Sequence, residues 1–127
     1  LCTEVLEHNQ HYQKLIDEML RVLRPGGQLL VTVPWSARFH YIPHDYFRYT
    51  PSTLKNMFKA FSNVEIRPRG SDLTSIANKL IVMMARNPLW LVLAPVGILF
   101  VVLAHLSLLI KIGSEDDPLG YTVMAKK

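Results

Sequence analysis

The sequence predicts an α/β fold in which helices pack on a partly parallel sheet. Three observations carry this prediction. An apolar stripe with helical spacing at residues 9–23 ends at Pro25-Gly26-Gly27 and is followed by the short apolar run Gln28–Val33. Strand-like segments recur at residues 63–69 and 120–125. A helix, a glycine turn and a buried strand form the second half of a βαβ unit, which requires a sheet with parallel strands.

The first helix is expected over residues 9–23, with Asn9 as its N-cap and apolar side chains such as Leu15 and Met19 on one face. The first strand of the βαβ unit would end at Leu1-Cys2. Most of that strand would precede the chain, so we expect the chain to be a fragment of a longer protein.

The strand at residues 28–33 is apolar at nearly every position, which is typical of a parallel strand buried on both faces. Residues 35–49 are aromatic, contain histidines and follow no period, so they predict a loop at the carboxyl end of that strand. Ligands of open α/β sheets bind at this end of the strands.

A second helix is expected over residues 51–60, with Thr50 as N-cap and Pro51 as first helical residue. Residues 63–69 alternate apolar and charged side chains, which predicts a half-exposed strand. Residues 120–125 predict a closing strand.

An apolar segment separates these last two strands. Asn87–Ile110 contains no formally charged residue, and a helix over Pro88–Ile110 would be about 35 Å long, enough to cross a hydrocarbon core. Because the strands on either side belong to one sheet, the chain has to return. Leu73–Met84 and Pro88–Ile110 therefore either form a helical hairpin that turns at Asn87-Pro88 or both lie in the membrane interface.

We favour monotopic attachment, in which the apolar helices dip into one leaflet, because Leu73–Met84 is too short to span and Pro95 and Gly97 interrupt the longer run. The alternative is that these helices cover the sheet or dimerise in water. Anionic headgroups would be contacted by the basic residues Arg67, Arg69, Lys79, Arg86 and Lys111.

The composition excludes several classes of protein. It is 50% hydrophobic and 19% charged, which excludes intrinsic disorder. A single cysteine, Cys2, excludes an internal disulfide. Residues 1–63 and 64–127 each carry seven basic and five acidic side chains, so the net charge of +4 is spread evenly and a nucleic-acid partner is not expected.

Two segments, Thr3–His8 (TEVLEH) and Glu18–Gly27 (EMLRVLRPGG), resemble the downstream half of class I S-adenosylmethionine-dependent methyltransferases, in particular the type 11-like group. A third segment, His44–Thr50 (HDYFRYT), resembles a subgroup of these enzymes. The resemblance covers residues 1–70 and, more loosely, 119–127.

This resemblance implies a partial Rossmann-like three-layer sandwich whose N-terminal strands are missing, with an apolar helical insertion before the last strand. Residues 1–70 would form the C-terminal half of the methyltransferase domain, residues 71–113 the insertion and residues 114–127 the closing strand. The family's strand order places the last strand antiparallel between its two predecessors, so Tyr121–Ala125 should lie between the strands at 28–33 and 63–69.

The implied cofactor is S-adenosylmethionine. The family holds it with a glycine-rich turn after the first strand and an acidic residue after the second, and neither motif is in this sequence. Cys2, Thr3 and Glu4 match the loop that borders the cofactor's methionine moiety. We therefore expect the isolated chain to bind the cofactor weakly and to be inactive without the rest of its parent.

The reaction implied is transfer of a methyl group to an oxygen, nitrogen or carbon atom, for which His8 or His44 would serve as general base. The alternative to a catalytic role is a structural one. His8 would then be a polar residue packed at a helix start, and Glu7 would stabilise a helix N-terminus. The acceptor pocket is expected to be lined by Trp35, His40, Asp45, Tyr46 and Arg48.

Two alternatives concern this loop. Asp45 and Arg48 would also suit a purely structural pair that clamps the loop. His40, His44 and Asp45 suit a divalent metal by residue type, but they share no helical spacing and no cysteine or second carboxylate joins them. The sequence therefore predicts no metal site.

The sequence thus indicates a methyltransferase on the cytoplasmic side of a membrane, peripheral or monotopic, which acts on a small-molecule or lipid-like acceptor. A non-catalytic membrane-binding module that retains part of a Rossmann-like sheet is the alternative. The identity of the acceptor and the oligomeric state are not predicted.

Overall fold

The computed structural model describes residues 1–110 and 112–127, which fold as two units. The first unit comprises Leu1–Pro68 and Gly120–Lys127, and the second comprises Arg69–Leu119. Residues 114–119, which the sequence analysis grouped with the closing strand, thus belong to the second unit.

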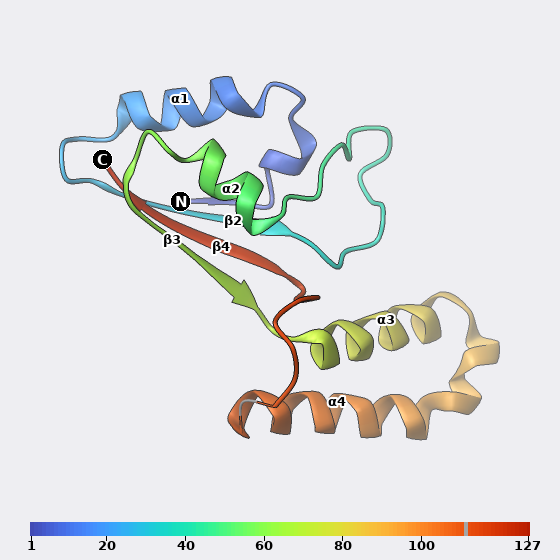
Figure 1. Cartoon of the computed structure of the whole chain (residues 1–127). Coiled ribbons are helices and arrows are strands. Elements are labelled where there is room, and N and C mark those ends of the chain that lie inside the picture. Colours follow the sequence, from blue (N-terminus) through green and yellow to red (C-terminus); the bar gives the residue numbers. More distant parts are fainter. Residues whose placement is uncertain (111) are drawn as a thin grey trace. The chain divides into compact units, whose positions relative to one another are not determined.

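The first unit contains a four-stranded sheet in the order β1-β2-β4-β3. Its strands are β1 (Cys2–Thr3), β2 (Gln28–Pro34), β3 (Ser62–Arg69) and β4 (Gly120–Lys126). The first two strands are parallel, and β4 runs antiparallel to β2. Figure 1 shows β4, in red, between β2 and β3. The prediction that the closing strand lies antiparallel between its two predecessors is confirmed.

The core of this unit lies on one face of the sheet. Val31 stands opposite Val123 and Leu29 opposite Ala125, and all four side chains are buried. Because directly opposed residues share a face, the next pair along, Leu30 with Met124, points to the other face. Leu30 is 38% exposed but Thr32, on the same face, is buried, so the prediction that residues 28–33 are buried on both faces is wrong only at Gln28 and Leu30.

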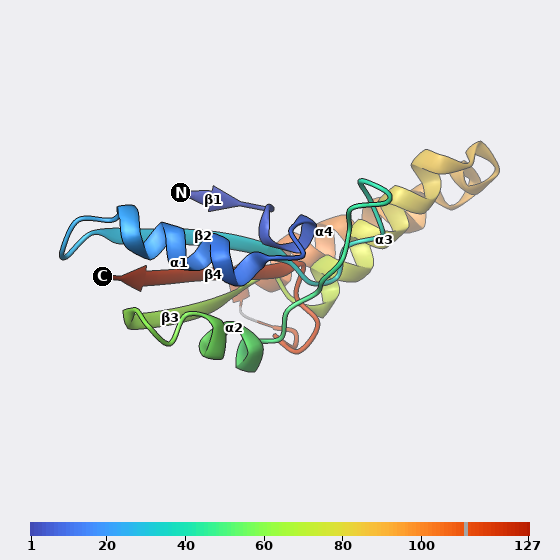
Figure 2. The same ribbon diagram turned by 90° about the horizontal axis from the view of Figure 1, so that it is seen from above.

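Two helices cover the buried face: α1 (Tyr12–Val22) and α2 (Pro51–Met57) (Figures 1 and 2). Ile16 of α1 and Leu54 of α2 belong to the same core cluster as the buried residues of β2 and β4. The described residues of this unit thus supply two layers, a sheet and one helical layer, of the three that a Rossmann-like sandwich has.

The predicted helix starts are confirmed in one case only. Thr50 caps α2, because its Oγ1 accepts a hydrogen bond of 3.2 Å from the Thr53 N–H, although α2 ends at Met57 rather than at residue 60. Asn9 does not cap α1. It follows a short 3₁₀ helix, η1 (Leu6–His8), and its Oδ1 accepts from the His11 N–H at 2.8 Å, so α1 begins only at Tyr12.

The second unit is a helical hairpin of α3 (Asp72–Arg86), the 3₁₀ helix η2 (Pro88–Leu93) and α4 (Ala94–Ile110) (Figure 1). The chain turns at Asn87, whose side chain caps η2 by accepting from the Leu89 N–H. Pro95 does not break α4, because it stands in the first turn, where a proline lacks no helical hydrogen bond. Within the described residues, Pro88–Ile110, with mean hydropathy 2.5, is long and apolar enough to cross a membrane.

The open end of the hairpin is held by polar contacts within the same unit. The Asp72 N–H donates to the Ser114 carbonyl at 3.0 Å, and Asp72 Oδ1 accepts from the Ser114 N–H at 3.1 Å. Ser75 Oγ donates to the Asp117 carbonyl at 2.7 Å. These bonds close the connection that leads from α4 back to the sheet.

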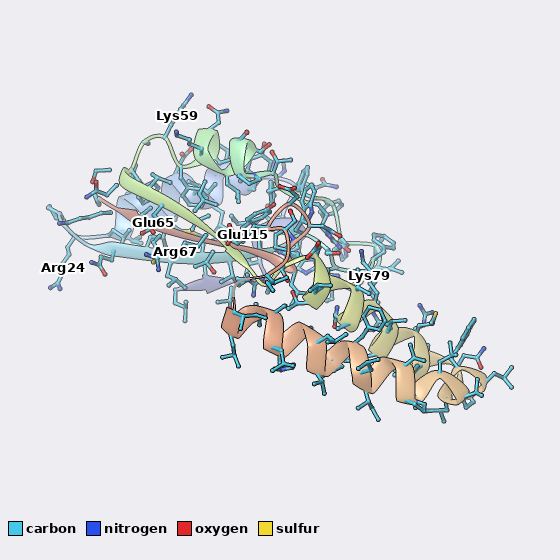
Figure 3. The ribbon with its side chains drawn as sticks, turned by 60° about the horizontal axis from the view of Figure 1, so that its bottom comes forward. Arg24, Lys59, Glu65, Arg67, Lys79 and Glu115 are labelled. Carbon is cyan, nitrogen blue, oxygen red and sulfur yellow. The ribbon has the colours of Figure 1, made fainter. Side chains whose placement is uncertain are left out.

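Lys79 and Arg67, which were expected to meet headgroups, have acidic partners. Lys79 Nζ lies 3.6 Å from a carboxylate oxygen of Asp117, and Arg67 Nε lies 2.5 Å from Glu65 Oε1. Figure 3 shows Glu65 and Arg67 side by side on β3. The prediction for Lys111 lies outside the described residues.

Candidate active site

The candidate site lies at the carboxyl ends of β1 and β2. These strands are parallel, so the segments that follow them, η1 and the loop of residues 35–49, meet at the same edge of the sheet (Figure 1). This is the edge at which the sequence analysis placed the site.

Hydrogen bonds tie the loop to η1. The Tyr46 N–H donates to the Glu7 carbonyl at 2.9 Å, and the buried Tyr49 hydroxyl donates to the Leu6 carbonyl at 2.9 Å. His8 Nδ1 donates to the His44 carbonyl at 2.6 Å. A carbonyl oxygen only accepts, so this last bond places a proton on Nδ1 of His8. Two segments 36 residues apart are thereby locked together.

Asp45 and Arg48 form a bidentate ion pair inside the loop, with N–O distances of 2.6 and 2.9 Å. Asp45 Oδ2 also accepts from the His40 N–H at 2.9 Å, and Arg48 donates to the Arg38 carbonyl at 3.1 Å. Hydrogen bonds from Arg48 hold the pKa of the Asp45 carboxyl far below its usual range. These contacts agree with the alternative that Asp45 and Arg48 form a structural pair that clamps the loop.

A cavity of about 330 Å³ opens beside this pair. Three of the five predicted acceptor-pocket residues, Asp45, Tyr46 and Arg48, line it, together with Ala37, Phe39 and Phe47. Trp35 is elsewhere: its ring packs against the core, with its centroid 6.1 Å from that of Tyr121.

The three histidines of the candidate site, His8, His40 and His44, divide into two groups. The rings of His8 and His40 meet edge to face with centroids 4.9 Å apart, and Tyr41 also contacts His8. His44 is exposed, and its Nδ1 forms a hydrogen bond of 2.8 Å with the Tyr46 hydroxyl. The two residues expected to share the role of general base, His8 and His44, thus have different surroundings.

Residues expected at the cofactor lie at the end of β1. Thr3 and Glu4 are exposed there, and Glu4 has a positive φ of 52°. Burial raises the pKa of the Cys2 thiol, so this thiol is neutral. A second cavity, of about 500 Å³, is bordered by Cys2 and Thr3 and otherwise by apolar side chains.

This end of the sheet fits S-adenosylmethionine only in part. Thr3 and Glu4 offer polar groups at the correct strand end, but in the described residues no glycine turn opens a helix toward them. In the described residues, this strand end would therefore form one border of a cofactor site and not its cradle.

Glu7 is a residue whose importance the sequence analysis missed. It is 0% exposed, and neither of its carboxylate oxygens has a hydrogen-bond partner. Burial raises the pKa of this carboxyl above its usual range. The sequence indicated a charge at a helix start, whereas η1 is a single 3₁₀ turn in which Glu7 is buried; only the motif Glu7-His8 hinted at more.

Comparison with known families gives one match: residues 1–31 match a family described as a methyltransferase domain. Searches among curated proteins and among solved structures found no significant match. The matched segment contains β1, α1 and most of β2. In the sheet, β2 is followed by β4 and then β3, which is the order that the resemblance predicted.

The sheet of the first unit is compatible with a partial Rossmann-like methyltransferase fold, and residues 1–31 of this unit are similar to a methyltransferase domain. The match covers 31 of 127 residues, so the acceptor, the catalytic residues and the role of the hairpin are matters of proposal.

Proposed function

We propose that the chain is the downstream part of an S-adenosylmethionine-dependent methyltransferase that acts on a membrane-proximal, lipid-like acceptor. The observation that carries the methyltransferase assignment is the antiparallel β4 between β2 and β3, in a unit whose first 31 residues match a methyltransferase domain. S-adenosylmethionine would supply an activated methyl group, so the protein has mainly to position the acceptor and take up its proton.

The proton acceptor in this proposal is His44. His44 Nδ1 shares a hydrogen bond with the Tyr46 hydroxyl, and the tautomer in which Nδ1 donates has its lone pair on Nε2; this is the tautomer that the proposal requires. His8 suits this role less, because its Nδ1 is held by the His44 carbonyl and its Nε2 faces Glu7. Asp45 and Arg48 would hold the loop in shape, with the cavity beside them taking the acceptor.

The composition of the hairpin supports the membrane part of the proposal. Its buried positions are occupied by small residues, while large apolar side chains point outward, the reverse of a hairpin built for water. Gly97 lies so close to α3 that an added Cβ would clash with Met84 Cε. In Figure 3 the sticks on the side of α4 away from α3 are carbon. The buried positions are Ser75, Ala77, Gly97, Ala104 and Ser107.

We place the protein on the cytoplasmic side of a membrane, attached monotopically. Arg86 and Asn87 stand at the turn of the hairpin, and Arg86 is exposed. A hairpin that dipped to the bilayer centre with this turn foremost would bury that charge at a cost of about 3 kcal/mol. Helices that lie in one leaflet leave Arg86 at the headgroups.

The experiment uses the intact gene product that contains this chain, incubated with methyl-labelled S-adenosylmethionine and with membranes. Label is expected in the lipid extract rather than in the aqueous phase. His44→Gln should lower turnover by about 100-fold, the usual effect of a lost general base. Unchanged turnover in His44→Gln would remove His44 from the mechanism, and transfer to water-soluble acceptors alone would contradict the lipid-like substrate.

The second candidate, a non-catalytic membrane-binding module, rests on the same outward-facing apolar side chains of α4. It predicts binding to vesicles with no methyl transfer to any fraction, a result that would reject the methyltransferase proposal.

A further inference from the structure

Three side chains from two separate segments converge beside η1. Glu7 and His8 follow β1, and His40 comes from the loop after β2. One potential ligand atom from each side chain lies within 4.8 Å of the other two. A carboxylate and two imidazoles form a donor set that suits divalent transition metals.

The carboxylate of Glu7 is the first sign that something is bound here. Glu7 is 0% exposed, and both of its carboxylate oxygens are buried without a hydrogen-bond partner. Buried polar groups nearly always have a partner, because an unpaired one costs free energy and an unpaired charge costs more. The nearest cationic candidate, His8 Nε2, lies 3.6 Å from Oε1, which is too far for a hydrogen bond.

The tautomers of the two histidines are the second sign. His8 Nδ1 lies 2.6 Å from the His44 carbonyl oxygen, and His40 Nδ1 lies 2.9 Å from the Arg38 carbonyl oxygen. Each Nδ1 must therefore carry the proton, which leaves a lone pair on each Nε2. Histidines that bind metals are held in this way, with the other ring nitrogen donating to a carbonyl or a carboxylate.

The carboxylate of Asp45 completes this second layer of support. Its Oδ2 lies 3.3 Å from His40 Nδ1 and accepts a hydrogen bond from the His40 N–H. A negative charge behind an imidazole raises the basicity of the far nitrogen and so strengthens a metal bond.

From these observations we propose that Glu7, His8 and His40 bind a divalent transition-metal ion of the zinc type. Two ligands of a tetrahedral zinc ion lie about 3.4 Å apart, close to the 3.6 Å between His8 Nε2 and Glu7 Oε1. The potential ligand atom of His40 lies within 4.8 Å of those of Glu7 and His8, so the three side chains would draw closer together around the ion. Three protein ligands leave a fourth position open for water or for an oxygen atom of a ligand.

A proton is the competing occupant. One proton on Glu7 or on His8 would relieve the contact between Oε1 and Nε2 but would leave the other Glu7 oxygen without a partner. A metal ion accounts for the carboxylate and for both lone pairs at once.

The test uses the chain of residues 1–127, stripped with a chelator and titrated with Zn²⁺ by calorimetry and with Co²⁺ by visible absorption. One ion per chain is expected, with the intense visible bands of tetrahedral Co²⁺. His40→Gln should weaken binding by at least about 10–100-fold, because the loss of an outer-layer partner alone has that effect. Glu7→Gln should do the same if circular dichroism shows it folded.

The matched control is His11→Gln, which removes an exposed histidine three residues beyond η1. It should bind as the unmodified chain does. The proposal is overturned if the unmodified chain binds no ion, if His40→Gln binds equally well, or if His11→Gln loses as much affinity as His40→Gln. Because His40 lies on a loop, its variant keeps the test decisive even if Glu7→Gln does not fold.

Discussion

The carboxylate of Asp45 receives two hydrogen bonds from the guanidinium of Arg48, Nη1 to Oδ1 at 2.6 Å and Nη2 to Oδ2 at 2.9 Å. The Asp45 side chain is 0% exposed and also accepts the His40 N–H. Because Arg48 in turn donates to the carbonyls of Ala37 and Arg38, the pair determines the path of the loop that carries His40 and His44.

We expect Arg48→Ala to lower the free energy of unfolding by about 2–3 kcal/mol, because it leaves a buried carboxylate without its charged donors. The measurement is urea denaturation followed by circular dichroism. The matched control is Arg21→Ala. Arg21 pairs with Glu18 on the surface of α1, with side chains 70% and 55% exposed, so its loss should cost much less stability than the loss of Arg48. Equal costs for the two variants would contradict the clamp.

The same pair makes stability depend on pH. Hydrogen bonds from Arg48 depress the pKa of Asp45 in the folded chain, so the unfolded chain binds that proton at higher pH. The contribution of Asp45 is therefore complete above the ordinary carboxyl value of 3.8 and is lost as pH falls below it. Glu7, whose pKa is raised by burial, contributes with the opposite sign.

The measurement that isolates Asp45 is the difference in unfolding free energy between the unmodified chain and Asp45→Asn from pH 6 to pH 2. We expect this difference to shrink as pH falls. A difference that stays constant with pH would contradict the depressed pKa.

The sequence predicted the sheet well because its signals there are local. A few neighbouring residues are enough to predict the Pro25-Gly26-Gly27 turn, the apolar strand β2 and the alternating strand β3. The strand order was predicted from the resemblance. The exposed face of Leu30 was not predictable in this way, since apolarity does not show whether a second layer covers it.

The site was predicted only by its location. The loop after β2 was correctly placed at the carboxyl edge, but the meeting of Glu7 with His40 depends on 32 intervening residues and on bonds such as Tyr49 to the Leu6 carbonyl. The spacing of residues in the sequence cannot predict a contact between side chains this far apart in the chain. The metal prediction considered only residues of the loop, and so it left out the buried carboxylate of Glu7.

The bond between Tyr49 and Leu6 gives a third prediction. Tyr49→Phe removes one hydrogen bond to the Leu6 carbonyl, which keeps its bond from the Asn9 N–H, and we expect a loss of about 1 kcal/mol in unfolding free energy. Tyr41→Phe serves as the control, because Tyr41 is 68% exposed. If both variants keep the stability of the unmodified chain, the hydroxyl does not hold the loop on η1.

A fourth prediction concerns the cofactor. Since Thr3 and Glu4 would form only one border of the proposed site, residues 1–127 alone should bind S-adenosylmethionine with a Kd of about 1 mM or weaker, a binding free energy of about 4 kcal/mol. Isothermal calorimetry measures this directly. Micromolar binding by this chain would show that its own residues cradle the cofactor.

The last prediction tests the hairpin against a membrane. Ile98 on α4 and Val22 on α1 are almost equally exposed, at 64% and 63%, but only Ile98 belongs to the apolar surface proposed to enter lipid. A lysine side chain at this position would have to enter the membrane interface or extend toward water, at a free-energy cost of up to about 3 kcal/mol. In a flotation assay with vesicles that contain anionic lipid, Ile98→Lys should therefore bind about 10–100-fold less than the unmodified chain, while Val22→Lys should bind as well as the unmodified chain or better, because it adds a cation to the surface. Equal losses in both variants would mean that general solubility, and not α4, determines the binding. If the unmodified chain stays in the aqueous phase without detergent, the proposal of membrane attachment is rejected. The exposed apolar side chains of α4 would then be covered by protein in water.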